Sequence, residues 1–166
     1  GGFAMSWLLM MLACSGGKDS GVEATETTES TTSGTDDTAT ATGSAALFGN
    51  LTCTVPGTMG KFYIAVFDVE PFQVGSATVV AQASSPESVD LSSPDKMAAY
   101  RVEDIPTRAD PYYVVAFVDI NNNYEATQTP DSGDIISLDG SGAYSTTLAT
   151  DGEEVQLDMV FNMAMP

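Results

Sequence analysis

Short apolar runs, separated by turn-forming residues, are the feature of residues 47–166 that most limits how this chain can fold. Gly, Pro, Asn and Asp interrupt the runs, and the apolar residues almost nowhere recur at the spacing of a helix face. The pattern predicts strands near 46–54, 60–69, 76–83, 97–103, 111–119, 142–148 and 153–162. The 120 residues suffice for one domain with its own core.

Two kinds of strand are expected. In 153–162, Val155, Leu157, Met159 and Phe161 alternate with mostly polar residues, which is typical of a strand with one wet face. Segments 62–67 and 112–118 are apolar on both faces, so we expect central strands with a loop covering the second face. Seven short strands at this spacing predict an all-β fold, a seven-stranded antiparallel two-sheet sandwich of the immunoglobulin-like or transthyretin-like kind.

One stretch of the chain carries a family resemblance. Residues 100–106 end in Ile-Pro, and after a short turn residues 112–118 lead into Asp-Ile-Asn-Asn-Asn at 119–123. This succession resembles the transthyretin-like (carboxypeptidase-regulatory-like) β-sandwich modules, in which a strand ending in Leu/Ile-Pro turns into a Tyr-x-Val strand and an Asp-x-Asn-x-Asn loop. Segments 47–51 and 61–68 fit the first two strands of such modules. The resemblance implies a non-catalytic accessory or adhesive module on a secreted protein.

The N-terminal residues 1–14 have a different character. The apolar run from Phe3 to Cys14 is 12 residues long, too short for a bilayer core that needs about 20. Its Leu-Ala-Cys ending resembles a bacterial lipoprotein signal, which implies a diacylglycerol on the thiol of Cys14 and removal of the residues before it. The alternative is a buried apolar segment with a core cysteine. Because the chain opens on Gly1 and not on Met, we expect further residues ahead of it.

The composition of residues 15–46 predicts a disordered tether. Nearly half of them are Ser or Thr, and six acidic side chains face a single Lys. Such a segment cannot bury enough apolar surface to offset its ordering entropy. Ser15 follows Cys14 where an Asp would favour inner-membrane retention, so we expect a bacterial cell-envelope location at the outer membrane, periplasmic or surface-exposed.

The sequence argues against an enzyme. It has no histidine, the commonest general base and a usual zinc or iron ligand. Hydroxyisourate hydrolases and intradiol dioxygenases of similar sandwich form depend on histidines. Seventeen Asp and Glu in 47–166 leave a carboxylate-dependent hydrolase or carbohydrate-binding domain as the alternative. The one Trp, Trp7, lies in the signal segment, so it supplies no sugar platform.

The net charge of residues 47–166 further limits which classes of partner the domain can bind. Residues 47–166 carry seventeen acids against four Lys and Arg, a net charge of −13. Nucleic acid and anionic lipid headgroups would be repelled. We therefore expect contact with the membrane through the lipid on Cys14, no nucleic-acid partner, and a divalent cation as a natural ligand. Plain solubility is the alternative explanation of the charge.

The second cysteine is Cys53. If Cys14 is acylated, Cys53 has no partner within the chain, and we expect a small buried residue beside Leu51 and Val55. Should Cys14 stay as a free thiol, a disulfide between Cys14 and Cys53 becomes the alternative in an oxidising compartment.

A candidate calcium site follows the strand at 111–119. Its predicted ligands are Asp119, Asn121, Asn123 and Glu125 at alternate positions, completed by Asp131 or Asp134. The loop is not an EF-hand, because Tyr124 stands where Gly is needed and Pro130 where Glu is needed. The alternative is a turn in which Asp119 and Asn121 cap their own backbone amides.

These observations predict a lipid-anchored, extracytoplasmic binding or structural module that is non-catalytic and stabilised by calcium, with a protein or carbohydrate ligand that the sequence does not name. A small surface carbohydrate-binding domain or a carboxylate-dependent hydrolase is the alternative. A concave, aromatic-lined groove that holds two carboxylates would favour that alternative.

Overall fold

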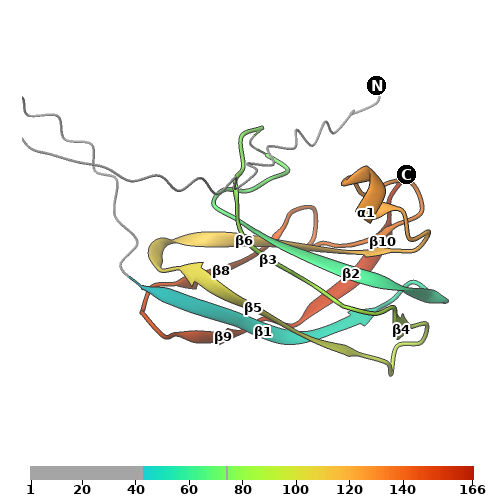
Figure 1. Ribbon diagram of the computed structural model, residues 1–166, viewed down its shortest axis with the longest axis horizontal. Helices are drawn as coiled ribbons and strands as arrows, with labels where there is room; N and C mark the ends of the chain where they lie inside the picture. Colours follow the sequence, from blue (N-terminus) through green and yellow to red (C-terminus); the bar gives the residue numbers. More distant parts are fainter. Residues whose placement is uncertain (1–42, 74) are drawn as a thin grey trace, which may run out of the picture. The chain divides into compact units, whose positions relative to one another are not determined.

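The computed structural model describes residues 43–73 and 75–166, a domain of strands with one short helix (Figure 1). Its elements are β1 (Ser44–Cys53), β2 (Thr58–Phe67), β3 (Val79–Ser84), β4 (Val89–Leu91), β5 (Ala98–Pro106), β6 (Arg108–Asp119), α1 (Tyr124–Thr127), β7 (Ile135–Ser137), β8 (Tyr144–Leu148), β9 (Glu154–Gln156) and β10 (Met159–Ala164). The prediction of an all-β fold is confirmed. Within these residues, no helix has the length and apolar character needed to cross a bilayer.

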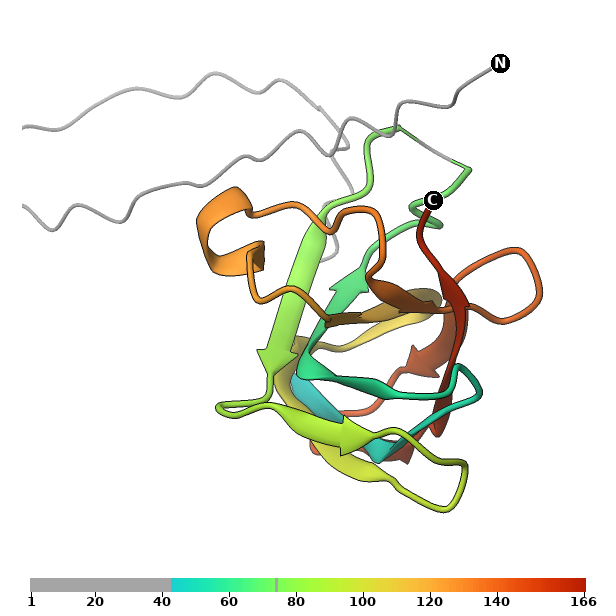
Figure 2. The same ribbon diagram turned by 90° about the vertical axis from the view of Figure 1, so that its right-hand side faces the viewer.

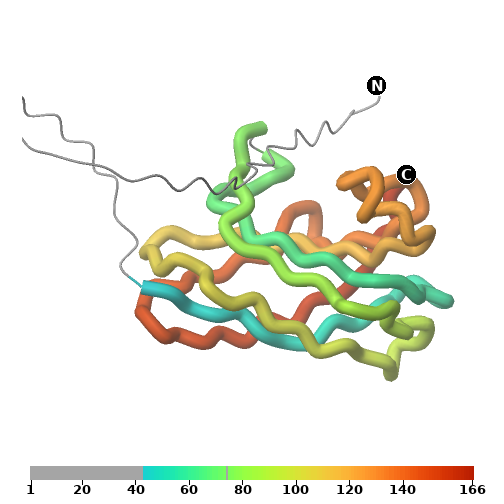
Figure 3. Tube along the Cα trace, viewed as in Figure 1, coloured from blue at the N-terminus to red at the C-terminus, as the bar shows by residue number. Residues whose placement is uncertain are grey.

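The strands form one main hydrogen-bonded path, in the order β3-β2-β6-β7-β10-β1-β5. Strand β4 adds to β2, β8 to β6 and β9 to β1. The path curls around the core, as Figures 2 and 3 show, so that β3 and β5, its two ends, come to lie near each other.

The pairing differs from the predicted sandwich in two respects. Strand β1 runs parallel to β9 and β10, whereas an antiparallel arrangement was expected throughout. The described residues also hold ten strands where seven were predicted, because β4 and β7 are additional short strands and the last predicted strand is divided into β9 and β10. Alternation of side chains reports that a segment is extended, but it does not report the direction of its neighbour.

The division of the last strand has a local cause at residues 157 and 158. The Leu157 N–H donates to the Phe48 carbonyl oxygen at 2.8 Å, and the Asn50 N–H donates to the Asp158 carboxylate at 2.8 Å. A side chain therefore accepts the N–H that a ladder carbonyl would otherwise accept. β9 and β10 keep the same register against β1 on either side of the break.

The core contains the inward side chains of most strands. Its largest fully buried members are Phe161, Leu47, Leu51, Ile64, Leu91, Ile105, Leu148 and Met159. Val155 and Leu157 pack partly buried against it. The predicted inward face of the last strand is confirmed.

Strands β2 and β6 are central, as predicted, and pair from Lys61 with Asp119 to Phe67 with Tyr113. On their outer face, Tyr63 stacks on Phe117 with ring centroids 5.1 Å apart. Tyr124, the first residue of α1, packs on both rings at 4.4 Å and 4.7 Å. The loop expected to cover the second face of these strands is therefore, at this end, the segment that contains α1.

Strand β1 begins inside the segment predicted to be a tether. Ser44 pairs with Pro106 of β5, and Ala45 and Ala46 are buried. Residues 15–42 of that segment, together with the predicted signal and its Cys14, lie outside the described residues.

Candidate functional site

The candidate site is the connection from β6 to β7, residues 119–134, called here the Asp119 loop. β6 and β7 are antiparallel neighbours, and their pairing ends with Val118 opposite Ile135. Asp119 is the last residue of β6 and Asp134 directly precedes β7. Both follow the last pair outward, so the ladder brings these two carboxylates close together.

Asp119 is 1% exposed and folds the first half of the loop around itself. Its Oδ1 accepts a hydrogen bond from the Asn123 N–H at 3.2 Å, and its Oδ2 accepts one from the Tyr124 N–H at 3.0 Å. Asn122 takes the left-handed conformation, φ 57°, that such a tight turn requires. The alternative in which Asp119 caps its own loop's amides is therefore what the structure shows for this residue.

Asp134 is fully buried and closes the second half of the loop. Its Oδ1 accepts the Ile120 N–H at 3.1 Å, and its Oδ2 accepts the Asp131 N–H at 2.9 Å. Burial raises the pKa of the Asp134 carboxyl, the two N–H groups act in the opposite direction, and the nearby carboxylates of Asp119 and Asp131 raise the pKa further.

Asp131 ties the two halves together through side chains. Its Oδ1 accepts the Asn121 Nδ2 amide at 3.0 Å, and its Oδ2 accepts the Asn123 Nδ2 amide at 2.5 Å. Asn121 thus donates to a carboxylate, and the alternative in which its side chain caps a backbone amide is not what the structure shows for this residue. The Oδ1 of Asn123 is buried and has no hydrogen-bond partner in the described part of the chain.

Five of the six predicted ligand residues are brought together in this loop, and Glu125 is not. Glu125 lies on α1 with its side chain 70% exposed, where it forms an ion pair with Lys61 at 2.7 Å. A helical turn at this point directs it away from the carboxylates. Residues 43–73 and 75–166 contain no group of three or more His, Cys, Asp or Glu side chains in a ready-made metal arrangement. The carboxylate oxygens of the loop instead accept N–H donors of the loop.

The aromatic cluster of Tyr63, Phe117 and Tyr124 beside the loop was not expected from the sequence. The hydroxyl of Tyr63 is buried there and, like the Asn123 oxygen, lacks a partner among the residues described. Burial raises the pKa of Tyr63, and the Glu125 carboxylate adds to the rise. The signal available in the sequence was the apolar character of both faces of β2 and β6.

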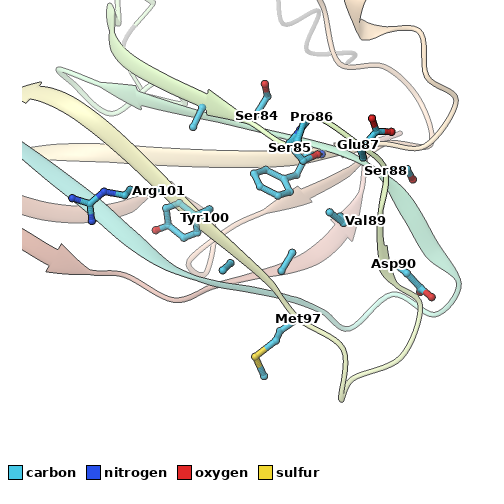
Figure 4. A pocket seen from close by; sticks show the side chains of 14 residues that line it. Ser84, Ser85, Pro86, Glu87, Ser88, Val89, Asp90, Met97, Tyr100 and Arg101 are labelled. Carbon is cyan, nitrogen blue, oxygen red and sulfur yellow. The ribbon is translucent and has the colours of Figure 1, made fainter.

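A second feature is a groove of about 550 Å³ between segment 83–90 and the first residues of β5 (Figure 4). Phe62 and Tyr100 lie at its base and are 5% and 6% exposed. Glu87 and Met97 stand at its rim and are exposed. The groove was not expected from the sequence, because its walls lie on opposite ends of the sheet path.

Cys53 is a free cysteine and is 2% exposed. Its thiol donates to Thr58 Oγ1 at 3.2 Å. The prediction of a small buried residue at the end of the first strand is confirmed.

Comparison with known proteins does not assign the chain to a family. No protein-family model matches it, and no curated protein matches it. Among solved structures, it is similar to an alternative pilotin from the type II secretion system of Vibrio cholerae, with 13% sequence identity and a TM-score of 0.42 over 70% of this chain and 96% of that chain. A likeness of this size assigns no function.

Proposed function

We propose that this protein is a non-catalytic, extracytoplasmic module, held at a bacterial membrane by a lipid on Cys14, and that calcium bound in the Asp119 loop stabilises its fold. The observation that carries the proposal is the Asn123 Oδ1, a buried acceptor that finds no donor in the part of the chain that the structure describes. Asn123 is itself hydrogen-bonded to Asp119 and Asp131, and Asp131 is hydrogen-bonded to Asp134. A buried polar atom without a partner is destabilising, and a cation would supply the missing interaction.

The carboxylate and amide oxygens of the loop are the type of ligand that a hard cation binds. Calcium takes six to eight oxygen ligands from carboxylates, amides, carbonyls and water. Each carboxylate oxygen has a second lone pair besides the one that accepts an N–H, so the hydrogen bonds seen here do not use up its acceptor capacity. The residues that would hold the ion are Asp119, Asn123, Asp131 and Asp134, with water completing the shell. Glu125 has no part in this set.

Charge supports the same proposal. Three carboxylates close to one another repel, and the repulsion is stronger at buried positions than in water. The Lys and Arg side chains of the described residues are engaged elsewhere, with Lys61 on Glu125, Lys96 on Asp90, Arg101 on Glu103 and Glu154, and Arg108 on backbone carbonyls. A divalent cation would therefore offset the repulsion.

The anchor is inferred from the sequence around Cys14. About 30 residues separate Cys14 from the start of β1 at Ser44, and a fully extended chain of that length reaches about 100 Å. A lipid on Cys14 would thus hold the domain at the membrane and still allow it to stand clear of the surface. In a two-membrane bacterial host, wild-type protein should fractionate with the outer membrane and incorporate a labelled fatty acid. Cys14→Ser should move it to the soluble fraction, and unchanged membrane association would contradict the anchor.

Thermal melting of the full-length protein tests the calcium proposal. Calcium at about 100 times its dissociation constant should stabilise the fold by about 2.7 kcal/mol relative to chelator. Asp119→Ala should remove this increment, although the variant is also less stable in chelator. Asp139→Ala, which removes an exposed carboxylate from the turn after β7, should keep the increment. Equal melting curves in calcium and chelator would overturn the proposal.

The alternative, a carbohydrate-binding domain or hydrolase, is less well supported by the groove. Glu87 and Asp90 place two carboxylates in its lining. However, Asp90 accepts hydrogen bonds from Lys96 and Ser92, and the rings of Phe62 and Tyr100 are buried in the core. An exposed aromatic platform for a sugar is not offered by these two rings.

A further inference from the structure

Two buried side-chain polar atoms of the described residues have no hydrogen-bond partner, the Tyr63 hydroxyl and the Asn123 Oδ1. Both lie in the same small region. The Tyr63 ring packs on the Tyr124 ring with centroids 4.4 Å apart, and Tyr124 directly follows Asn123 in the chain. Buried polar atoms without a partner are rare in native proteins, so two of them in one region indicate a ligand that serves both.

The hydroxyl of Tyr63 lies near the carboxylates of the Asp119 loop. Tyr63 is on β2 opposite Phe117 of β6, and Asp119 follows Phe117 by two residues. Burial raises the pKa of Tyr63, and the Glu125 and Asp119 carboxylates raise it further. Because this effect acts through the phenol oxygen, it places that oxygen within electrostatic reach of Asp119, which is one of the proposed calcium ligands.

The ring of Tyr63 is held by contacts that lead back to the same loop. It stacks on Phe117 with centroids 5.1 Å apart, and Tyr124 packs on both rings. The Tyr124 N–H in turn donates to the Asp119 Oδ2 at 3.0 Å. Tyr124 thus connects the aromatic cluster with the calcium ligand Asp119, and the Tyr63 hydroxyl has a fixed position relative to the loop.

The chemistry of a phenol indicates how this hydroxyl would act. Calcium in proteins takes carboxylates, carbonyl oxygens and water as ligands, and a neutral phenol is not in that set. A phenol oxygen readily accepts a hydrogen bond from water. The four proposed ligands leave positions for water in a shell of six to eight oxygens. The partner expected for the Tyr63 hydroxyl is therefore a water molecule bound to the ion.

We propose that Tyr63 is a positioning residue of the calcium site, whose hydroxyl accepts a hydrogen bond from a calcium-bound water and so fixes that water in the shell. The inference rests on the calcium binding proposed above and assigns the aromatic cluster a role in that site. Groups that hold the ligands of a metal from outside its shell typically change its affinity about 10- to 100-fold.

Calcium titration and thermal melting of Tyr63→Phe test this proposal on the full-length protein in neutral detergent. The substitution removes the hydroxyl and keeps the ring in its stack. It should weaken calcium binding about tenfold or more. The melting temperature in chelator should be no lower than that of the wild-type protein, because no hydrogen bond is lost.

Tyr113→Phe is the matched control. It removes a hydroxyl from the same face of β6 as Phe117, opposite Phe67 and four residues away from Phe117. Because it lies outside the Asp119 loop, calcium affinity should stay within about twofold of the wild-type value.

Tyrosine absorption in the near ultraviolet gives a second readout, which loss of packing alone would not reproduce. Calcium should change this absorption in the wild-type protein, since the hydrogen bonding of the Tyr63 hydroxyl changes when the ion binds. Most of the change should be lost in Tyr63→Phe and kept in Tyr113→Phe. Equal changes in the two variants would contradict the role of the hydroxyl.

The possible failures are distinguishable. Unchanged calcium affinity in Tyr63→Phe would overturn the positioning role and leave the calcium site in place. A lower melting temperature of this variant in chelator would also overturn it, because the hydroxyl would then have a structural partner without the ion. Absence of saturable calcium binding to the wild-type protein would overturn the calcium proposal itself, and the role of Tyr63 with it.

Discussion

The side-chain amide of Asn123 donates a hydrogen bond to Asp131 Oδ2 at 2.5 Å, while the Oδ1 of the same Asn123 is buried without a partner in the described residues. This hydrogen bond sets the orientation of the side-chain amide, because Nδ2 can donate to a carboxylate and the amide oxygen, which carries no proton, cannot. Among the buried side-chain polar atoms of the Asp119 loop in the described residues, the Asn123 Oδ1 is the one without a partner.

Asn123→Asp should lower the stability of the domain in chelator and enlarge the increment of stability that calcium adds. In chelator it adds a carboxylate beside Asp131 and removes a donor, so the free energy of unfolding should fall by about 1 to 3 kcal/mol. In calcium the added charge should enlarge the stabilising increment. Chemical denaturation in both conditions measures this. Gln82→Glu on β3 makes the same change of charge outside the loop and should leave the increment unchanged; an increment that stays the same in Asn123→Asp would contradict the assignment of this residue as a ligand.

Gly49→Ala should destabilise the domain by about 2 kcal/mol or more, as backbone overpacking does. A Cβ on Gly49 would lie 2.3 Å from the Leu157 carbonyl oxygen, in the place where β1 and the last strand approach. Gly75→Ala is the matched control, since a Cβ there has nothing within 4 Å and no left-handed φ is present. Its effect should remain within about 0.5 kcal/mol in urea unfolding. Similar stability of the two variants would argue against this close approach.

The strands could be predicted where apolar and polar residues alternate, because successive side chains of an extended backbone point to opposite faces of a sheet. Met159 and Phe161 face the core as expected for this reason. The parallel pairing of β1 with β9 and β10 could not be predicted, since alternation does not encode a strand's partner. β4 and β7 have three residues each, too few to show a period.

The candidate site was predictable to a similar degree. Alternate oxygen-bearing residues after β6 indicated a loop in which side chains converge, and the pairing of Val118 with Ile135 explains why Asp119 and Asp134 meet. The place of Glu125 was not predictable, because the turn α1 is four residues long and follows no amphipathic pattern. The groove arises from curling of the sheet, which brings together β3 and β5 from distant parts of the chain. Calcium binding itself stays a prediction.

Removal of the N-terminal residues should show where the folded domain begins. A chain starting at residue 43 should melt cooperatively, within a degree or two of full-length protein. A chain starting at residue 47 loses buried Ala45 and Ala46 and the pairing of Ser44 with Pro106, so its melting temperature should fall by several degrees. Calorimetry compares the three proteins. Equal melting of the two shortened chains would show that residues 43–46 contribute nothing to the fold.

Thiol counting should report the state of Cys14 without membrane fractionation. Cys53 is buried, so a thiol reagent should detect no thiol in native lipidated protein and one after denaturation. One native thiol and two after denaturation would mean that Cys14 is present and unmodified. No thiol in either state would indicate the disulfide between Cys14 and Cys53. Cys53→Ala serves as the control, and its lipidated form should give no signal in either state.

Isothermal titration of calcium into chelator-treated full-length protein distinguishes a calcium site from a hydrogen-bonded turn. We expect saturable binding of about one ion per chain, lost in Asp119→Ala and retained in Asp139→Ala. Magnesium should compete poorly, because it requires a smaller and more regular shell than this loop of carboxylates and amides provides. A titration of the wild-type protein without saturable heat, together with an unchanged melting temperature, would mean that the Asp119 loop binds no calcium and is a hydrogen-bonded turn only.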